Sequence, residues 1–271
     1  MFDFILHLCF NFFKLCLIFK LLWNKKFWDI ASGYDVIILD AYGVFTFSDG
    51  IAAEAVAVMK ALREAGKMVL ILSNSSAGAV NTQTKYAKKG LLKGVHYDAV
   101  MTSGEYGNKV AQQGALPVKG TKMYVFGTAN FKRPDDKLPD MFKGTIYSVT
   151  EDISEADFIY AGIPQINYQD RIMLEDFIPE IKKCLVSGLP MVCCNPDLRA
   201  NEGGRFVVRP GLIVKTYQAL GGKVYLYGKP DPQIFDFLLQ GVNVDRSKML
   251  MVGDTLGTDI LGHKEPELLR A

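Results

Sequence analysis

The sequence predicts an α/β protein built on a parallel sheet, with a second α/β region inserted into the chain. From about residue 34 onward, short apolar runs alternate with amphipathic segments, which is the pattern of strand–helix–strand units. Four of these runs end in polar loops, as strands do at the ligand-binding edge of an open parallel sheet. Nearly half of the 271 residues are hydrophobic, so the chain can bury a large core.

The first region is expected over residues 33–105, because strand-like and helix-like segments alternate there. The helix predicted at 52–67 is rich in Ala, Leu, Met and Glu, and the first strand-like run, DVIILD, is mostly apolar. The expected elements are a strand at 35–40, a helix at 52–67, a strand at 68–76, a helix at 77–90 and a strand at 97–105.

The inserted α/β region is expected over residues 106–206. It carries strand-like runs of its own and one long helix predicted at 168–188. Residues 207–271 are then expected to return to the first region, with a further strand at 248–255. The strand-like runs of the insertion lie at 122–127, 156–162 and 190–197.

Residues 1–32 form a hydrophobic extension that is expected to lie outside the fold. His7, Asn11 and Lys14 recur at helical spacing in this apolar stretch and would draw a narrow polar stripe. Three interpretations stay open: an interfacial amphipathic helix, a poor single membrane span, or a segment outside the functional domain. The last is favoured because the organised pattern begins only after it, and contact with a membrane depends on this extension.

Charge and cysteine content restrict the classes of partner. The 31 basic and 29 acidic residues give a net charge of +2 without a long run of one sign, which argues against nucleic-acid binding. The five cysteines form no CxxC pair, and reduced thiols in a cytoplasmic protein are expected. The sequence leaves homo-oligomer formation open.

Polar residues at the ends of the predicted strands form a candidate site for phosphate chemistry. Carboxylates that converge on one sheet edge suit Mg²⁺, and a lysine supplies compact positive charge for phosphate oxygens. Ser73 follows a strand and can offer its hydroxyl together with the amides of the next helix. With its charge offset, Asp40 can attack phosphorus and form an aspartyl phosphate. The candidates are Asp40, Ser73, Asn74, Lys229, Asp254 and Asp259.

Each of these residues alone has an ordinary structural explanation. An aspartate after a strand often caps a turn, Ser73 and Asn74 could cap a helix, and Lys229 could lie in a solvated turn. Asp259 could cap the helix that follows it. Their order and joint placement favour a site, and a cleft between this sheet edge and the insertion is its expected location.

The motifs from about Tyr34 to Gly262 resemble the haloacid dehalogenase-like (HAD) superfamily. The resemblance is to class IIA, which has a Rossmann-like core and a large α/β cap of the C2 type inserted after the second motif. The segments TSGE, CNPD and RPGLIVKTYQALGG are also similar to class IIA sequences. The resemblance implies that Asp40 is the nucleophile, that Ser73 and Lys229 bind phosphate, that Asp254 binds the metal and that Asp259 supports it.

The resemblance also places a loop of the cap against the active site. Asn195 and Asp197 in this loop are therefore expected to contact substrate, and Arg199 and Arg205 could reach it. The alternative is a turn in which Asn195 and Asp197 satisfy backbone groups.

Tyr42 departs from the family's phosphatases, which carry at this position an Asp that protonates the leaving oxygen. The Tyr42 carbonyl can still bind the metal, whereas a phenol with a pKa near ~10 is a poor base at neutral pH. General acid–base help is worth about 10²- to 10⁴-fold in rate, so alkyl phosphates should react slowly. An aromatic residue here resembles a trait of one class IIA subgroup.

The end of the sequence is a second departure. Relatives continue through a helix into another strand, whereas this sequence stops at EPELLRA. A truncated edge would expose apolar surface near Met249–Val252.

The leading hypothesis is a Mg²⁺-dependent HAD-type hydrolase, a phosphatase that acts on a small phosphorylated metabolite. A catalytically impaired protein that binds a phosphate ligand is the alternative, motivated by Tyr42 and the short C-terminus. A third hypothesis keeps the enzyme and assigns it an acyl or other activated phosphate, whose leaving group departs without a proton donor.

Overall fold

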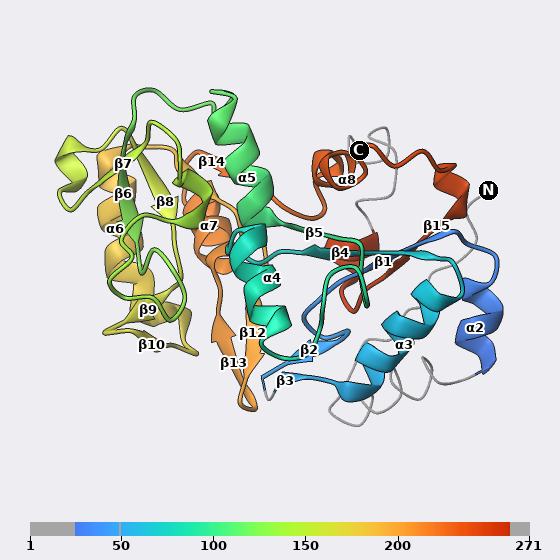
Figure 1. Cartoon of the computed structure of the whole chain (residues 1–271). Helices are drawn as coiled ribbons and strands as arrows, with labels where there is room; N and C mark the ends of the chain where they lie inside the picture. The colour runs from blue at the N-terminus through green and yellow to red at the C-terminus, as the bar shows by residue number, and fades with distance from the viewer. Residues whose placement is uncertain (1–24, 49, 261–271) are drawn as a thin grey trace. The chain divides into compact units, whose positions relative to one another are not determined.

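The computed structural model describes residues 25–48 and 50–260, and the chain forms two compact units (Figure 1). The first unit contains the chain up to Ser73, Val80–Met101 and the chain from Lys229 onward. The second contains Asn74–Ala79 and Thr102–Gly228. The chain therefore crosses between the units four times.

The first unit is built on a parallel sheet whose strand order is β15-β1-β4-β5. Strand β1 runs parallel to β15 and to β4, and all its residues are apolar and buried, because α3 and α8 lie on either side of the sheet (Figure 1). The elements are α2 (Lys25–Ala31), β1 (Val36–Leu39), β2 (Thr46–Phe47), β3 (Gly50–Ile51), α3 (Ala53–Glu64), β4 (Met68–Ser73), α4 (Ala79–Ala87), β5 (Ala99–Thr102), α8 (Pro232–Leu238) and β15 (Met249–Val252).

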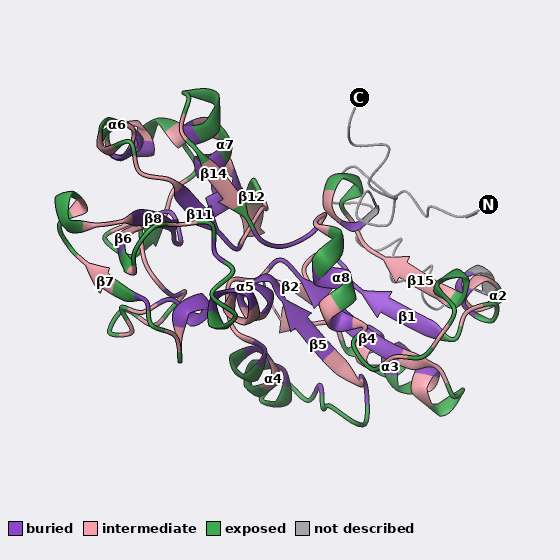
Figure 2. Ribbon diagram, turned by 90° about the horizontal axis from the view of Figure 1, so that it is seen from above, coloured by how far each residue is buried: buried purple, intermediate pink, exposed green. Residues whose placement is uncertain are grey.

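Figure 2 shows the contrast between the middle and the edge of this sheet, since β1 and β4 are largely buried whereas β15 is only partly buried. Within the described residues β15 is an edge strand, and a strand with one neighbour loses the cover that a second neighbour gives. The apolar residues Met249–Val252 thus keep partial exposure.

The helix α2 differs from the expectation that residues 1–32 lie outside the fold. Phe27 is buried and lines a small apolar cavity together with Leu39 and Met59, so α2 packs against the first unit. Residues 1–24, which carry the expected polar stripe, lie outside the described residues. Among the helices that are described, none is both long and apolar enough to cross a membrane.

The second unit contains a separate sheet of order β14-β11-β8-β6-β7, which confirms the predicted α/β fold with an inserted α/β region and is itself parallel. Helices α6 and α7 cover one face through Ile181 and Tyr217, and aromatic side chains such as Phe142 pack on the other. The elements are α5 (Ser103–Gln112), β6 (Lys122–Phe126), β7 (Ser148–Thr150), β8 (Phe158–Ala161), β9 (Gln165–Ile166), β10 (Gln169–Asp170), α6 (Ile178–Ser187), β11 (Met191–Cys193), β12 (Arg199–Glu202), β13 (Arg205–Val208), α7 (Pro210–Ala219) and β14 (Val224–Leu226).

The second unit extends to Gly228, whereas the sequence suggested a return to the first region after residue 206. Strand β14 pairs in parallel with β11, and the Tyr217 hydroxyl of α7 donates a hydrogen bond of 2.7 Å to the carbonyl of Leu189. Residues 207–228 thus complete the inserted sheet. The pattern of a strand and a helix is the same in both units, so periodicity alone could not assign this segment to either one.

The prediction of one long helix at 168–188 is wrong for the first half of that range, because α6 begins only at Ile178. Gln169 and Asp170 form a short strand that pairs with β9. The Asp170 carboxylate also forms an ion pair with the guanidinium of the buried Arg209, with an N–O distance of 3.1 Å. Pro179 lacks a backbone N–H and lies in the first turn of α6, where no hydrogen bond is lost.

We expect Ile159→Ala to lower the free energy of unfolding by about 2–5 kcal/mol, because Ile159 is fully buried in the core of the second unit. Urea unfolding followed by circular dichroism measures the change. Ile146→Ala is the matched control, since Ile146 is 76% exposed, and its effect should stay within about 0.5 kcal/mol. Equal effects of the two substitutions would contradict the described packing.

Candidate active site

The carboxyl ends of three adjacent strands place the candidate residues of the first unit at one edge of the sheet. In the parallel register, Leu39 of β1 lies opposite Val252 of β15 and Ile71 of β4. Asp40 directly follows β1, and its N–H donates a hydrogen bond of 2.8 Å to the Val252 carbonyl. Ser73 ends β4 and is buried at this same edge.

Lys229 lies between two of the carboxylates. Its Nζ donates to Oδ1 of Asp40 and to Oδ1 of Asp259, each at 2.6 Å. The Lys229 and Asp259 side chains are 2% and 0% exposed, whereas that of Asp40 keeps 10% exposure. Of the two carboxylates that bind Lys229, Asp40 is therefore the one that keeps some exposure to a substrate.

The electrostatics of this group follow from its burial. Burial raises the pKa of the Asp40 carboxyl well above its usual value, with Lys229 opposing this shift and the charges of Asp259 and Asp254 adding to it. Burial would lower the pKa of Lys229, but the two adjacent carboxylates raise it overall, so the ammonium stays protonated. Lys229 thus acts as a fixed positive charge.

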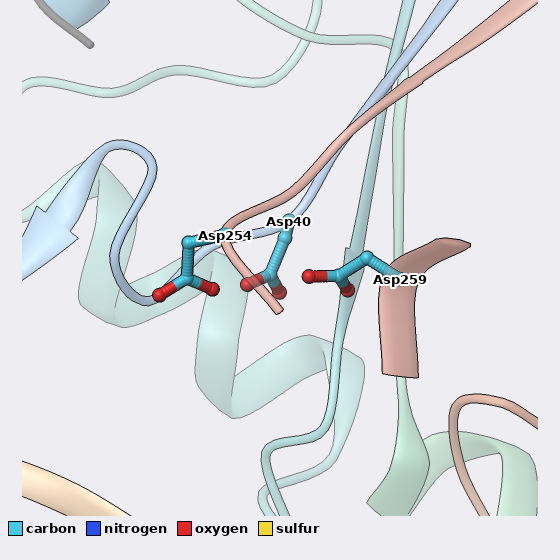
Figure 3. A group of neighbouring side chains, drawn as sticks. All are labelled: Asp40, Asp254 and Asp259. Atoms are coloured by element: carbon cyan, nitrogen blue, oxygen red, sulfur yellow. The ribbon is translucent and has the colours of Figure 1, made fainter. Parts of the chain in front are cut away.

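A third carboxylate, that of Asp254, completes the group. Ligand oxygens of Asp40, Asp254 and Asp259 lie within 4.8 Å of one another, and Figure 3 shows the three carboxylates converging with Asp40 between the other two. Gly43 makes room for Asp254, because a Cβ at this position would collide with its carboxylate, and the φ of +90° also favours glycine.

These residues fit a divalent metal ion. Three carboxylates gather around one ammonium in this group, and a cation would lower the pKa of Asp40 by favouring its ionised form. Oxygen donors suit a hard cation such as Mg²⁺. Asp259 already accepts from Lys229 and, through Oδ2, from the N–H of Thr255 at 3.0 Å, so Asp40 and Asp254 are the better-placed ligands.

Tyr42 lies in the loop that follows Asp40, and its side chain is partly buried. Its backbone forms a bridge with Thr46, next to the short hairpin of β2 and β3. The metal-ligand role of its carbonyl stays a prediction.

The remaining candidates belong to the second unit. Asn74 donates a hydrogen bond of 2.9 Å to Oδ1 of Asp197 and accepts one of 3.0 Å from the Ser103 hydroxyl. Asn195 accepts from the N–H of Asp197 at 3.1 Å, which is the turn that the structural alternative expected. Substrate contact by Asn195 and Asp197, and phosphate binding by Asn74, stay predictions.

Sequence reasoning missed two residues that hold these groups. Thr255 donates its N–H to Asp259 and its hydroxyl, at 3.1 Å, to Asp254. Its position between the two aspartates in GDTLGTD was the available signal. Ser103 is fully buried and donates a hydrogen bond to Asn74, and its place in the TSGE segment was the available signal.

Comparison with known families agrees with this arrangement. The profile of the haloacid dehalogenase-like hydrolases matches residues 37–137, and a second profile, of HAD-hydrolase-like proteins, matches residues 226–265. Together they cover about half of the chain, and they include Asp40, Lys229 and Asp254. The chain belongs to the haloacid dehalogenase-like hydrolases. The predicted family, of class IIA with a C2-type cap, is confirmed.

Individual relatives are distant but cover most of the chain. The 4-nitrophenylphosphatase of Schizosaccharomyces pombe is 24% identical over 262 residues, which are 92% of this chain and 86% of that protein. The glycerol-3-phosphate phosphatase of Mus musculus is 24% identical, over 86% of this chain and 76% of that protein. A haloacid dehalogenase-like hydrolase from Brucella suis shares the fold with a TM-score of 0.74 at 24% identity, covering 86% and 83% of the two chains.

We expect Gly43→Ala to weaken Mg²⁺ binding about tenfold or more, because the added methyl group displaces the Asp254 carboxylate. Isothermal titration calorimetry with MgCl₂ measures the affinity, and circular dichroism checks the fold. Gly33→Ala is the control, since the nearest atom to its added Cβ lies at 3.6 Å. An unchanged Mg²⁺ affinity in Gly43→Ala would remove Asp254 from the metal site.

Proposed function

We propose that this protein is a Mg²⁺-dependent phosphatase of small phosphorylated metabolites that works through an aspartyl phosphate on Asp40. The observation that carries the proposal is the Lys229 ammonium, which lies 2.6 Å from both Asp40 and Asp259 beside the Asp254 carboxylate. A buried cation at a sheet edge can supply positive charge to phosphate oxygens once a metal ion offsets the neighbouring carboxylates.

Each residue of the site has a separate role in this proposal. An Asp40 oxygen attacks phosphorus while the bond to the leaving oxygen breaks and the leaving group takes the electron pair. Lys229 supplies positive charge to the phosphate oxygens, and Ser73 donates its hydroxyl to them. Water then attacks the phosphorus of the aspartyl phosphate, which releases inorganic phosphate and regenerates Asp40.

Asp40 and Asp254, together with the Tyr42 carbonyl, would hold the Mg²⁺ ion, and Asp259 would support them. When bound, Mg²⁺ supplies positive charge that offsets the repulsion between these carboxylates and a phosphate dianion. Without that charge the three carboxylates of the site would disfavour a phosphate dianion.

Tyr42 restricts which leaving groups the proposed enzyme can expel. A phenol is a weak proton donor at neutral pH, so a substrate whose leaving group is already stable as an anion gains most from this site. Acyl and aryl phosphates have such leaving groups, whereas alkyl phosphates do not. The proposal therefore favours activated phosphates, in keeping with a relative whose name is 4-nitrophenylphosphatase.

Asp40→Asn should lower Mg²⁺-dependent hydrolysis of 4-nitrophenyl phosphate by at least about 10³-fold, because an amide cannot form the covalent intermediate. Release of nitrophenolate measures the rate with Mg²⁺ and with EDTA. Asp236→Asn is the matched control, since Asp236 is 56% exposed in a surface ion pair, and it should keep the parental rate. Persistent activity in Asp40→Asn would overturn the mechanism.

Tyr42→Asp should raise hydrolysis of glycerol 3-phosphate at least about tenfold while changing 4-nitrophenyl phosphate hydrolysis less, because only the alkyl leaving group needs a proton. Tyr42→Phe is the matched control that removes the hydroxyl without adding an acid. An equal gain on both substrates would contradict the assigned restriction.

The second candidate is a phosphate-ligand binder without turnover, which the phenol at Tyr42 favours. It predicts that neither the natural chain nor Tyr42→Asp hydrolyses a panel of phosphate esters, while inorganic phosphate raises the melting temperature of both. Turnover by either protein decides for the phosphatase.

A further inference from the structure

Three of the four chain crossings meet in one cluster of the second unit. Asn74 directly follows the crossing after Ser73, Gly228 directly precedes the crossing to Lys229, and Ser103 lies just after the crossing at Thr102. All three cluster residues contact one another within the second unit. Residues that are far apart in the sequence are thus joined where the chain changes units.

Hydrogen bonds hold this cluster together. The Asn74 amide donates to Asp197 at 2.9 Å, and its oxygen accepts from the Ser103 hydroxyl at 3.0 Å. Asn74 is 3% exposed and Ser103 is fully buried, so water competes little for the bond between them, whereas Asp197 is only partly buried. Because Asp197 is a carboxylate, its bond to Asn74 is charge-assisted and stronger than a neutral one.

Gly228 packs directly on this pair. A Cβ at this position would collide with the Ser103 hydroxyl and would lie 2.9 Å from both the Asn74 oxygen and the Cδ of Pro196. Its φ of +136° is also open to glycine but rarely to other residues. The backbone that leads into Lys229 is therefore pressed against the hydrogen-bonded pair.

The loop that carries Asp197 is itself anchored. The N–H of Gly211, at the start of α7, donates a hydrogen bond of 3.0 Å to the Asp197 carbonyl. The N–H of Arg209 donates one of 3.1 Å to the Leu198 carbonyl. Arg209 is in turn buried and ion-paired with Glu202 at 2.7 Å and with Asp170 at 3.1 Å. The loop that carries Asp197 is thus held at the carbonyls of Asp197 and Leu198, and the Asp197 carboxylate in turn accepts the hydrogen bond from Asn74.

We propose that Asn74 and Asp197 are positioning residues, which fix the two backbone crossings and thereby hold Ser73 and Lys229 where both can bind one phosphate. The inference rests on the proposed function, because it takes Ser73 and Lys229 as the phosphate-binding residues. Each of these two residues is covalently joined to a member of the cluster, so the cluster limits the backbone freedom of both. In this proposal Asp197 acts through its hydrogen bond to Asn74.

An exchange of the two polar groups tests the proposal. Asn74→Asp alone sets two carboxylates against each other, and Asp197→Ala alone removes the acceptor. The double variant Asn74→Asp with Asp197→Asn restores the hydrogen bond with donor and acceptor reversed, and the new carboxylate at position 74 can still accept from Ser103. A residue that contacts substrate directly would not be rescued by this exchange.

The measured quantities are the affinity for inorganic phosphate, from calorimetry in the presence of Mg²⁺, and kcat and KM for 4-nitrophenyl phosphate. Each single variant should weaken phosphate binding and lower kcat/KM about tenfold or more, and the double variant should recover to within about threefold of the natural chain. Ser103→Ala, which removes only the hydroxyl donor, should show a smaller loss and provides a folded variant if a single exchange proves unstable.

Single variants that match the natural chain in phosphate affinity, or a double variant that stays as weak as the singles, would overturn the positioning role. A loss of melting temperature with unchanged phosphate affinity would also overturn it. The proposed phosphatase function fails in a different way, namely by activity in Asp40→Asn or by absence of phosphate binding in the natural chain.

Discussion

A lysine with 2% of its side chain exposed can persist in a folded protein only if its charge is compensated, and in this chain Asp40 and Asp259 provide that compensation. The three residues come from the end of β1, from the segment after β14 and from the turn after β15. An unpaired buried ammonium would cost several kcal/mol, so this ion group ties the three segments together. The geometry of the catalytic edge depends on it.

The same interaction determines the ligand chemistry of the edge. One ammonium cannot balance three carboxylates, and the burial of Asp40 makes its ionised form still harder to maintain. A divalent cation corrects both imbalances, since it neutralises the surplus charge and favours the ionised nucleophile. In the proposed function, a bound cation would therefore also favour the binding of a substrate phosphate.

The chain crosses between the insertion and the first unit four times, and three of these crossings lie beside one cluster of the insertion. Asn74 and Asp197 are 123 residues apart in sequence and share one hydrogen bond, and Gly228 lies against the same pair. The flanking residues Ser73 and Lys229 are those assigned to phosphate. In the proposal made above, the inserted domain would thus position catalytic residues without supplying a catalytic group of its own.

Much of the fold was already determined by the sequence. Runs such as VIIL in β1 are too apolar for any place except the interior of a sheet covered on both faces, and helix periodicity between them indicates parallel connections. The residues at strand ends, Asp40, Ser73 and Asp254, were identifiable because strand direction places them at one edge. Tertiary structure decided what local pattern cannot encode. It assigned α7 and β14 to the second unit, because strand partners are chosen by packing over long sequence distances. Only the tertiary structure shows the hydrogen bond between Asn74 and Asp197. The two residues are 123 positions apart in the sequence, and such a contact leaves no periodic signal in either segment.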